Sequence, residues 1–158
     1  MGNIFSASEV VEIGVKIEEN GRDFYRQAAA KSKNEPAVKT FELLAGEEEG
    51  HIKKFESILS AVKKYEPREA YPNEYFSYIK SLSGEYVFTK DKKGAEMAGT
   101  VNSEIEAVDL GIGFEKDSIL FYEEMKKFVL EEEKNIVDKL LEQEKQHLRK
   151  LNDLRRLL

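Results

Sequence analysis

The chain has 158 residues and 41% of them are hydrophobic, which is enough for one domain with a buried core. Its net charge of −6 argues against a nucleic-acid partner, because phosphate backbones attract basic surfaces. The absence of cysteine excludes disulfides, iron–sulfur clusters and thiolate catalysis, so any metal site must use nitrogen and oxygen ligands. No apolar run is long enough to span a bilayer, and no basic segment with a following apolar stretch opens the chain. We therefore expect a cytoplasmic protein without a membrane partner.

Helical spacing of apolar residues predicts two long helices in the first part of the chain. The first is expected from Ser6, whose spacing to Glu9 matches a capping box, to about Lys31. The second follows Asn34, a favoured capping residue, and extends to about Lys64. The expected buried stripe of the first helix is Ile13, Gly14, Ile17, Glu18, Gly21, Phe24, Tyr25 and Ala28. That of the second is Val38, Phe41, Leu44, Ala45, Glu48, His51, Ile52, Phe55, Leu59 and Val62.

A long connection then follows, in which prolines and glycines, among them Gly94 and Gly99, interrupt any continuous helix. Its segment YPNEYFSYIKSL predicts a short helix starting near Asn73. A connection of this length can return along the bundle, so the second and third helices can be parallel. Its aromatic residues are expected to seal the bundle or a subunit contact rather than to bind a ligand. They are Tyr71, Tyr75, Phe76, Tyr78, Tyr86 and Phe88.

Two more helices are predicted in the last part of the chain. The third starts near Asn102 or Ser103, and the fourth extends from about Lys134 to the C-terminus. The expected stripe of the third is Ile105, Val108, Ile112, Glu115, Ile119, Tyr122 and Val129. That of the fourth is Val137, Leu140, Glu144, His147, Leu151, Leu154 and Leu158. Four such faces predict an all-α four-helix bundle in a single domain, 1–158. It would consist of a hairpin over about 6–64, a crossover over about 65–101 and a hairpin over about 102–158.

The two hairpins are internal repeats. The segment GVKIEENGRDFY from Gly14 aligns with GIGFEKDSILFY from Gly111 at one constant offset. The second and fourth helices align in the same way, which pairs Glu48 with Glu144. Each hairpin supplies one glutamate and, about 30 residues later, a Glu-x-x-His motif. The resulting candidate residues are Glu18, Glu48, His51, Glu115, Glu144 and His147.

These six polar residues fall on the stripes that should be buried, and they include both histidines of the chain. Residues three apart lie on one helix face, so each Glu-x-x-His can present a carboxylate and an imidazole to one point. Buried, unpaired carboxylates cost several kcal/mol each, whereas two divalent cations would cancel four of them. A glycosidase-type acid pair would explain two carboxylates but not the two imidazoles. The pattern predicts a dinuclear site for two iron ions, with manganese as the alternative.

Within this site, we expect Glu48 and Glu144 to bridge the two ions. His51 and His147 would each bind one ion. Glu18 and Glu115 would be terminal ligands. Tyr25 and Tyr122 each follow a candidate glutamate by seven residues and stay on its helix face. They are candidate catalytic residues that could donate hydrogen bonds to metal-bound carboxylates. Ordinary aromatic packing in the core is the alternative for both tyrosines.

One glutamate from each of two helices and Glu-x-x-His from the other two is the ligand pattern of ferritin-like di-iron carboxylate proteins. The segments EENGRDFY, LAGEEEGHIKKF, FEKDSILFY and EQEKQHLRKL resemble the rubrerythrin-like branch of that superfamily. The resemblance covers the four long helices and implies a ferritin-like fold with a di-iron site.

Two features depart from the usual rubrerythrin pattern. Rubrerythrins usually carry a rubredoxin iron centre held by four cysteines, and this chain has none, so the resemblance implies an external electron-donor protein. They also have a further glutamate three residues after the third-helix ligand, where this chain has Ser118. The resemblance therefore implies chemistry with six protein ligands.

Several functions fit this pattern. The first is a di-iron oxidoreductase, peroxidase-like or ferroxidase-like, that reacts with peroxide or dioxygen. One alternative is a ferroxidase or iron-handling protein. Another is a bundle whose metal is structural and which acts through partners. A third is oxidation of an organic substrate. A homodimer formed through the aromatic crossover is the assembly that the sequence suggests.

Overall fold

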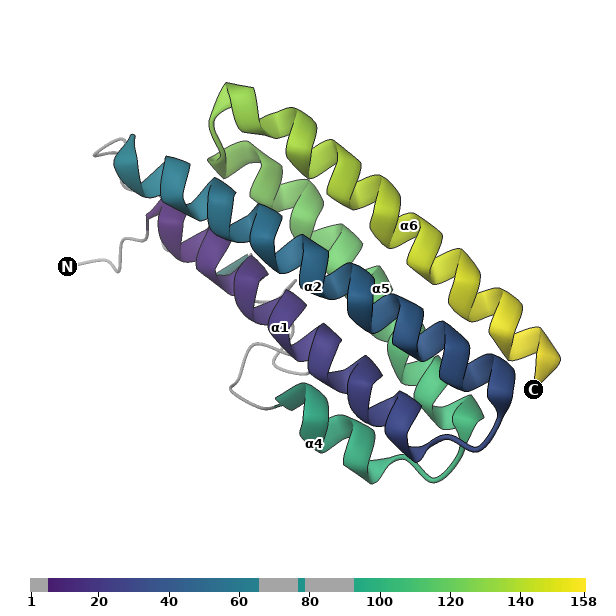
Figure 1. Cartoon of the computed structure of the whole chain (residues 1–158). Helices are drawn as coiled ribbons and strands as arrows, with labels where there is room; N and C mark the ends of the chain where they lie inside the picture. Colours follow the sequence, from purple (N-terminus) through teal and green to yellow (C-terminus); the bar gives the residue numbers. More distant parts are fainter. Residues whose placement is uncertain (1–5, 66–76, 79–92) are drawn as a thin grey trace.

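A computed structural model of the chain describes residues 6–65, 77–78 and 93–158. The long helices are α1 (Ala7–Lys31), α2 (Glu35–Lys64), α5 (Glu104–Met125) and α6 (Lys134–Leu157). They lie lengthwise beside one another, with the shorter α4 (Lys93–Thr100) along α1 (Figure 1). Two short 3-10 turns, η1 (Lys126–Phe128) and η2 (Glu131–Glu133), connect α5 to α6. The predicted all-α bundle of two helical hairpins is confirmed.

Helices α1, α2 and α5 begin where capping chemistry predicts. Ser6 and Glu9 form a reciprocal capping box, in which Ser6 Oγ accepts from Glu9 N and Glu9 Oε2 accepts from Ser6 N at 2.8 Å. Asn34 Oδ1 accepts a hydrogen bond from the backbone of α2 at 3.0 Å. Ser103 Oγ does the same for α5 at 3.2 Å, which identifies Ser103 rather than Asn102 as the cap.

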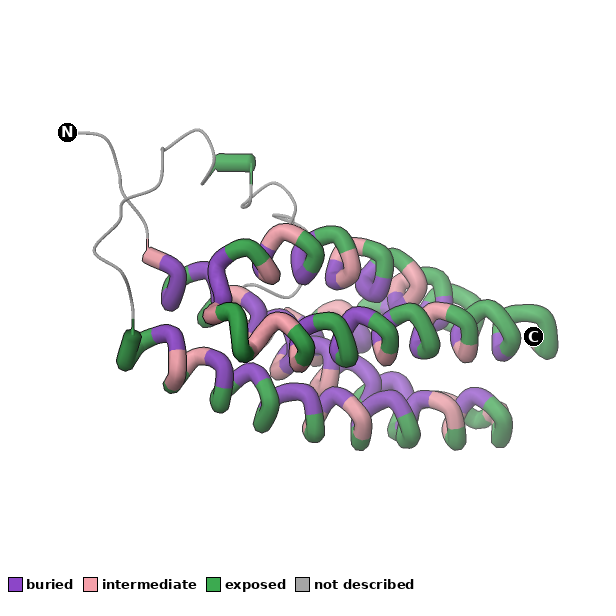
Figure 2. The backbone as a smooth tube through the Cα atoms, turned by 90° about the horizontal axis from the view of Figure 1, so that it is seen from above, coloured by how far each residue is buried: buried purple, intermediate pink, exposed green. Residues whose placement is uncertain are grey.

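Buried residues follow the inner sides of the helices (Figure 2). Most of the stripe predicted for α1, α2 and α6 is buried, but the stripe predicted for α5 was wrong in part. Ile105 is 41% exposed, and Ile112 and Ile119 are only half-buried, whereas Phe114 and Phe121 are buried. Apolar residues lie on several sides of α5, so their spacing alone did not define the face that packs in the bundle.

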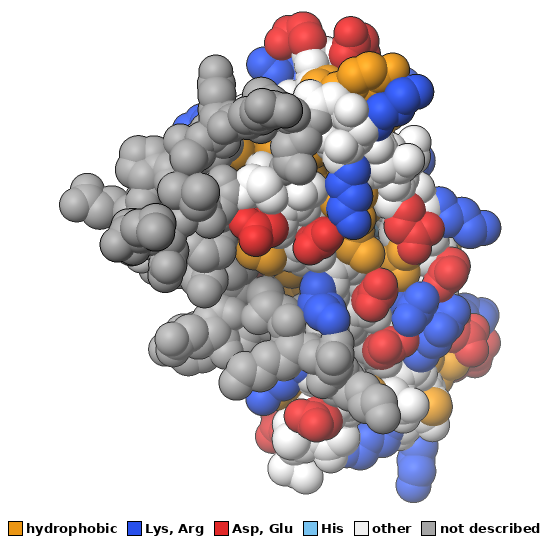
Figure 3. Space-filling view, turned by 90° about the vertical axis from the view of Figure 1, so that its left-hand side faces the viewer, with side chains coloured by type: hydrophobic (Ala, Val, Ile, Leu, Met, Phe, Trp, Pro, Cys, Tyr) orange, Lys and Arg blue, Asp and Glu red, His pale blue; other side chains and the backbone are white. Residues whose placement is uncertain are grey.

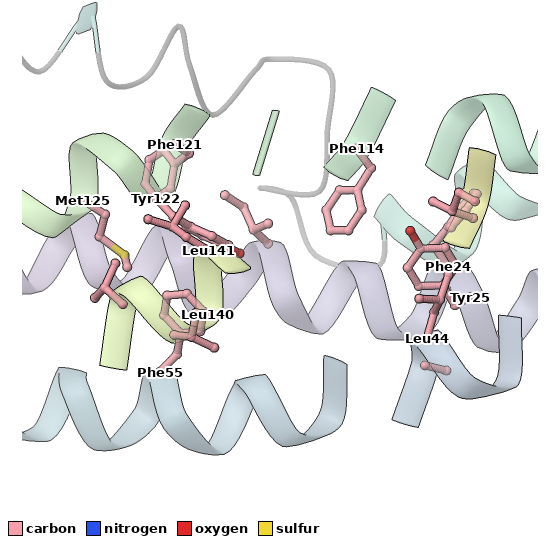
Figure 4. Close-up of a cluster of buried hydrophobic side chains, with 14 of the residues drawn as sticks. Phe24, Tyr25, Leu44, Phe55, Phe114, Phe121, Tyr122, Met125, Leu140 and Leu141 are labelled. Carbon is pink, nitrogen blue, oxygen red and sulfur yellow. The ribbon is translucent and has the colours of Figure 1, made fainter. Parts of the chain in front are cut away.

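The large core side chains form two groups along the bundle (Figure 4). Around Tyr25, the Phe24 and Phe114 rings meet its ring edge-on, with centroids 5.3 and 6.2 Å away. Around Tyr122, the nearest ring is that of Phe55, with a centroid distance of 4.9 Å. Such contacts are favourable beyond the area they bury. The two tyrosines therefore lie in separate aromatic groups, each packed against its neighbours.

Helix α4 was not predicted, because its glycines were interpreted as helix breakers. The backbone N–H of Gly94 instead donates to Asn20 Oδ1 of α1 at 3.1 Å. A Cβ atom on Gly94 would lie 1.9 Å from the backbone oxygen of Asn20, so glycine is needed for this close approach. At the other end of α4, Lys31 Nζ donates to the carbonyl oxygens of Gly99 and Val101 at 3.0 and 2.5 Å. Both ends of α4 are thus fixed to the bundle.

Most of the crossover predictions fall outside the described residues, including the start of a helix near Asn73 and every aromatic residue except Tyr78. Ser77 and Tyr78 are helical, and the Tyr78 side chain is 49% exposed. No helix in the described part of the chain is long and apolar enough to cross a membrane. Lys, Arg, Asp and Glu side chains are interspersed on the face shown in Figure 3.

We expect Gly94→Ala to lower the free energy of unfolding by about 1–3 kcal/mol, because the added methyl group overlaps a backbone atom. Gly99→Ala is the matched control in the same helix, since a Cβ there meets no atom of the described residues within 4 Å. Urea denaturation of the two variants measures the difference. Equal stability of both variants would show that α4 does not pack on α1 through Gly94.

Candidate metal centre

The six polar residues predicted from the repeats meet in the middle of the bundle. Helices α1 and α5 each supply a single glutamate, and α2 and α6 each supply one Glu-x-x-His pair. All six side chains are buried, with exposed fractions between 0 and 3%. The residues are Glu18, Glu48, His51, Glu115, Glu144 and His147.

Their atoms form two overlapping groups, in each of which the ligand atoms lie within 4.8 Å of one another. The first group contains Glu18, Glu48, His51 and Glu144, and the second contains Glu48, Glu115, Glu144 and His147. Two carboxylates belong to both groups, as bridging ligands of a pair of ions would. The predicted division into shared and terminal glutamates matches this arrangement, while the metal-binding role itself stays a prediction.

The orientation of the shared carboxylates fits bridging in atomic detail. Glu48 directs Oε2 toward His51 Nδ1 at 3.5 Å and Oε1 toward His147 Nδ1 at 3.3 Å. Glu144 directs Oε1 toward His51 Nδ1 at 2.9 Å and Oε2 toward His147 Nδ1 at 3.3 Å. Each shared glutamate thus offers one oxygen to each half of the site. The two imidazole rings are nearly parallel, with centroids 5.3 Å apart.

Most of the buried ligand atoms lack a hydrogen-bond partner among the residues that the structure describes. These atoms are Oε2 of Glu18 and Glu115, both carboxylate oxygens of Glu48 and Glu144, and Nδ1 of both histidines. They approach one another closely, His51 Nδ1 and Glu144 Oε1 to 2.9 Å, but their geometry does not meet that of a hydrogen bond. Buried polar groups are normally satisfied, and unsatisfied ones require an explanation such as an ion. Hard oxygen donors with imidazole nitrogens fit two divalent cations, so this donor set supports a di-metal site.

In the metal-free protein, protons compensate part of the buried charge. Burial and the charge of Glu18 raise the pKa of Glu48 to about 8, and burial beside Glu144 raises the pKa of Glu115 well above its ordinary value. Burial would by itself raise the pKa of Glu18, but contacts with Glu48 and His51 lower it to about 2. Metal ions would displace these protons, because ligands bind in their deprotonated forms.

Both imidazoles also hold protons strongly in the metal-free protein. Burial by itself would lower the pKa of His51, but the carboxylates of Glu144 and Glu18 beside it raise that pKa. The pKa of His147 is raised in the same way, against the effect of burial, by Glu115 and Glu144. The site therefore carries protonated imidazoles wherever no other cation balances its carboxylates.

The two predicted tyrosines contact the site, but each crosses to the other hairpin. Tyr25 of α1 donates to Glu115 Oε1 on α5 at 2.6 Å, and Tyr122 of α5 donates to Glu18 Oε1 on α1 at 2.6 Å. These bonds occupy one oxygen of each terminal carboxylate and leave the other oxygen free. These two crossed hydrogen bonds fix the carboxylates in position and connect the two hairpins.

Small residues beside the site make room for large ones. A Cβ on Gly21 would lie 2.6 Å from the Phe114 ring and 3.6 Å from the Glu48 carboxyl carbon. A Cβ on Gly14 would lie 2.8 Å from the Phe55 ring. Glycine at these positions therefore lets aromatic rings close over the site. Ser118, which aligns with Gly21 in the repeat, is buried, and its Oγ has no hydrogen-bond partner within the described residues.

Sequence reasoning missed one further contact. Glu47 Oε2 lies 2.5 Å from His147 Nε2, the imidazole nitrogen that points away from the six-residue cluster. Glu47 also forms an ion pair with Lys150 at 3.2 Å. The side chains of both Glu47 and Lys150 are 36% exposed, so neither appeared as a candidate for a buried site. The only available sequence signal was the place of Glu47 next to Glu48.

Comparisons with known proteins agree with this geometry. The sequence model of the rubrerythrin family matches residues 9–155. A crystal structure of a candidate ferritin-like diiron-carboxylate protein from Thermotoga maritima superposes with a TM-score of 0.74 at 26% sequence identity. The similarity covers 99% of this chain and 98% of the other. A comparison with curated proteins gave no match.

We expect Tyr25→Phe and Tyr122→Phe each to lower the free energy of unfolding by about 1–3 kcal/mol, because a buried carboxylate loses its donor. The repeat pairs the two tyrosines, but Tyr122→Phe should cost more than Tyr25→Phe, because the pKa of Glu18 is lowered to about 2 whereas that of Glu115 is raised, so only Glu18 is charged. Chemical denaturation of the metal-free protein measures the loss. Wild-type stability of both variants would indicate that the phenols serve only as packing.

The metal-free protein should lose stability as the pH rises from about 5 to 8. Glu48, Glu115 and both histidines have folded-state pKa values above their unfolded values, so the folded state holds extra protons in this range. These groups contribute fully to the free energy of unfolding below the pKa that they have in the unfolded chain, and their contribution declines as the pH rises above it. Glu18, with its pKa of about 2, is already ionised at pH 5 and contributes a constant amount.

Thermal denaturation at pH 5, 6.5 and 8, with and without added Fe(II), checks this trend. The stabilisation by metal should increase with pH, because protons compete with the ions for the same atoms. A metal-free protein that becomes more stable over this range would contradict the assignment of extra protons to the site.

Proposed function

The chain belongs to the rubrerythrin family, and we propose that it is a di-iron protein that reduces peroxide with electrons from an external donor protein. Glu48 and Glu144 would be shared by the two ions. Glu18 and His51 would complete one half of the site, and Glu115 and His147 the other. The observation that carries the proposal is the set of eight buried ligand atoms, in two overlapping groups, that have no hydrogen-bond partner in the described part of the chain.

When bound, two iron ions would supply the redox change that splits the O–O bond, while the protein provides position and environment. The overall reaction consumes one hydrogen peroxide, two electrons and two protons, and releases two water molecules. Iron is proposed over manganese because the structure from Thermotoga maritima is described as a diiron-carboxylate protein. The carboxylate and imidazole ligands suit both metals.

The protein's own residues determine what can reach the site. The six residues are at most 3% exposed, and the aromatic rings of Phe55 and Phe114 fill the space beside the glycines of α1. An organic substrate would need a cleft, whereas a small oxidant such as peroxide or dioxygen needs little room. Burial therefore supports a small substrate and shields the reaction from bulk water.

Hydrogen bonds would hold the ligands in place during the reaction. Tyr25 and Tyr122 each fix one oxygen of a terminal carboxylate and leave the second oxygen for an ion. Ser118 lies one helical turn beyond Glu115 and keeps a buried hydroxyl group with no partner in the described parts of the chain. This is the place where the usual rubrerythrin pattern has an additional glutamate.

The electrons must come from outside the chain. With no cysteine, the sequence cannot hold a rubredoxin-type iron centre of its own. We therefore assign the supply of electrons to a separate electron-donor protein.

Metal analysis of the chain loaded anaerobically with Fe(II) should give about two iron ions per chain. Addition of hydrogen peroxide should oxidise them rapidly, and a chemical reductant should restore the ferrous state for a further cycle. Uptake of many more ions would favour an iron-handling protein. Two ions that do not react with peroxide would favour a structural role for the metal.

Substitution of the shared ligands tests the site directly. Glu48→Ala and Glu144→Ala should each reduce the iron content to less than half, because each carboxylate belongs to both groups of candidate ligands. Glu49→Ala is the control on the same helix, since Glu49 pairs with Arg22 at 3.0 Å outside the site. Full iron content in both shared-ligand variants would disprove the proposed site.

A further inference from the structure

The two halves of the site resemble each other closely at their ligands but differ just behind them. In the repeat, Glu48 aligns with Glu144 and His51 with His147, so Glu47 aligns with Gln143. Glu47 of α2 contacts His147 of α6 across the bundle, so by the repeat the counterpart on the side of His51 is the neutral amide of Gln143. This difference is the basis of the inference.

The carboxylate contacts the imidazole at the nitrogen that a metal would leave free. Both histidines direct Nδ1 into the cluster of carboxylates, which leaves Nε2 for other partners. His147 Nε2 lies 2.5 Å from Glu47 Oε2. If Nδ1 bound an ion, Nε2 would carry the remaining proton and donate a hydrogen bond to Glu47. A hydrogen bond of this kind fixes the tautomer and the ring orientation of a metal ligand.

The other half of the site lacks this support. In the described part of the chain no hydrogen bond joins Gln143 to His51, and Gln143 Oε1 is buried without a partner. Even if the amide turned to accept from His51, a neutral acceptor would form a weaker bond than a carboxylate. Glu47 also forms an ion pair with Lys150 at 3.2 Å. Gln143 is neutral and cannot form an equivalent ion pair.

We propose that Glu47 makes the two halves of the site unequal, so that the half of His147 binds its metal ion more tightly than the half of His51. In this role Glu47 is a positioning residue that acts through the imidazole. The inference rests on the proposed function, since it assumes that the six residues bind metal. Its consequence is ordered loading, in which the first ion occupies the half of Glu115 and His147.

Anaerobic calorimetric titration of the chelator-treated full chain with Fe(II) tests the proposal. Co(II), whose visible absorption reports on its ligands, serves as a second probe. The wild type should bind in two steps whose affinities differ by about 10–100-fold, the usual effect of removing such a partner. His51→Ala should abolish the weaker step, and His147→Ala the tighter one.

Three variants separate the hydrogen bond from a general effect of charge. Glu47→Gln should weaken the tighter step by about 10–100-fold and alter the Co(II) spectrum of that step alone. Gln143→Glu should strengthen the weaker step, because it adds the missing carboxylate behind His51. Glu49→Gln, an equal loss of charge on the same helix, should leave both steps unchanged because Glu49 pairs with Arg22 instead.

The outcomes distinguish this inference from the proposed function. Absence of stoichiometric metal binding would overturn both. Two ions bound with equal affinity, or a tighter step that Glu47→Gln leaves unchanged, would overturn the inference alone. Glu47 is 36% exposed, so its substitution should leave the fold intact, and circular dichroism of the metal-free variant checks this. If that variant were misfolded, the gain expected from Gln143→Glu would decide the question.

Discussion

The structure depends on the burial of four carboxylates at the centre of a helical bundle. Apolar packing of α1, α2, α5 and α6 brings these groups together, although their mutual repulsion and their loss of hydration oppose it. The bundle tolerates them only with compensating positive charge. In the metal-free protein, protons on Glu48, Glu115 and the two imidazoles supply part of this compensation. Divalent cations would supply it more completely, because they also satisfy the lone pairs that hydrogen bonds do not reach.

The site also depends on both hairpins. Each group of candidate ligands takes three residues from one hairpin and a shared glutamate from the other. The tyrosines repeat this exchange, since Tyr25 and Tyr122 each donate to the terminal glutamate of the opposite hairpin. Neither hairpin alone could complete a half-site, so assembly of the bundle and formation of the site are coupled. Any ion that binds both groups would therefore stabilise the contact between the hairpins.

The sequence predicted the parts of the structure that local rules determine. Capping residues such as Ser6 and Asn34 marked helix starts, and the repeat identified the six residues that the structure brings together. The packing face of α5 was not predictable from spacing, because apolar side chains lie on several sides of that helix. Helix α4 was missed since its Gly94 serves a close contact with Asn20, which only the tertiary arrangement reveals. Glu47 was missed for the same reason, since it reaches His147 across the bundle.

Differences between the repeats are more informative about function than their identities. The matching positions give both halves of the site the same groups: carboxylates, an imidazole and a phenol donor at equivalent places. Two neighbouring positions break the match: Gly21 makes room for Phe114 where Ser118 keeps a buried hydroxyl, and Glu47 supports an imidazole where Gln143 does not. A symmetric site would give both ions the same ligands and the same surroundings. Because these differences lie next to the ligands, the two ions would have equal charge and donor sets but unequal environments, which allows one to be held firmly while the other exchanges or reacts.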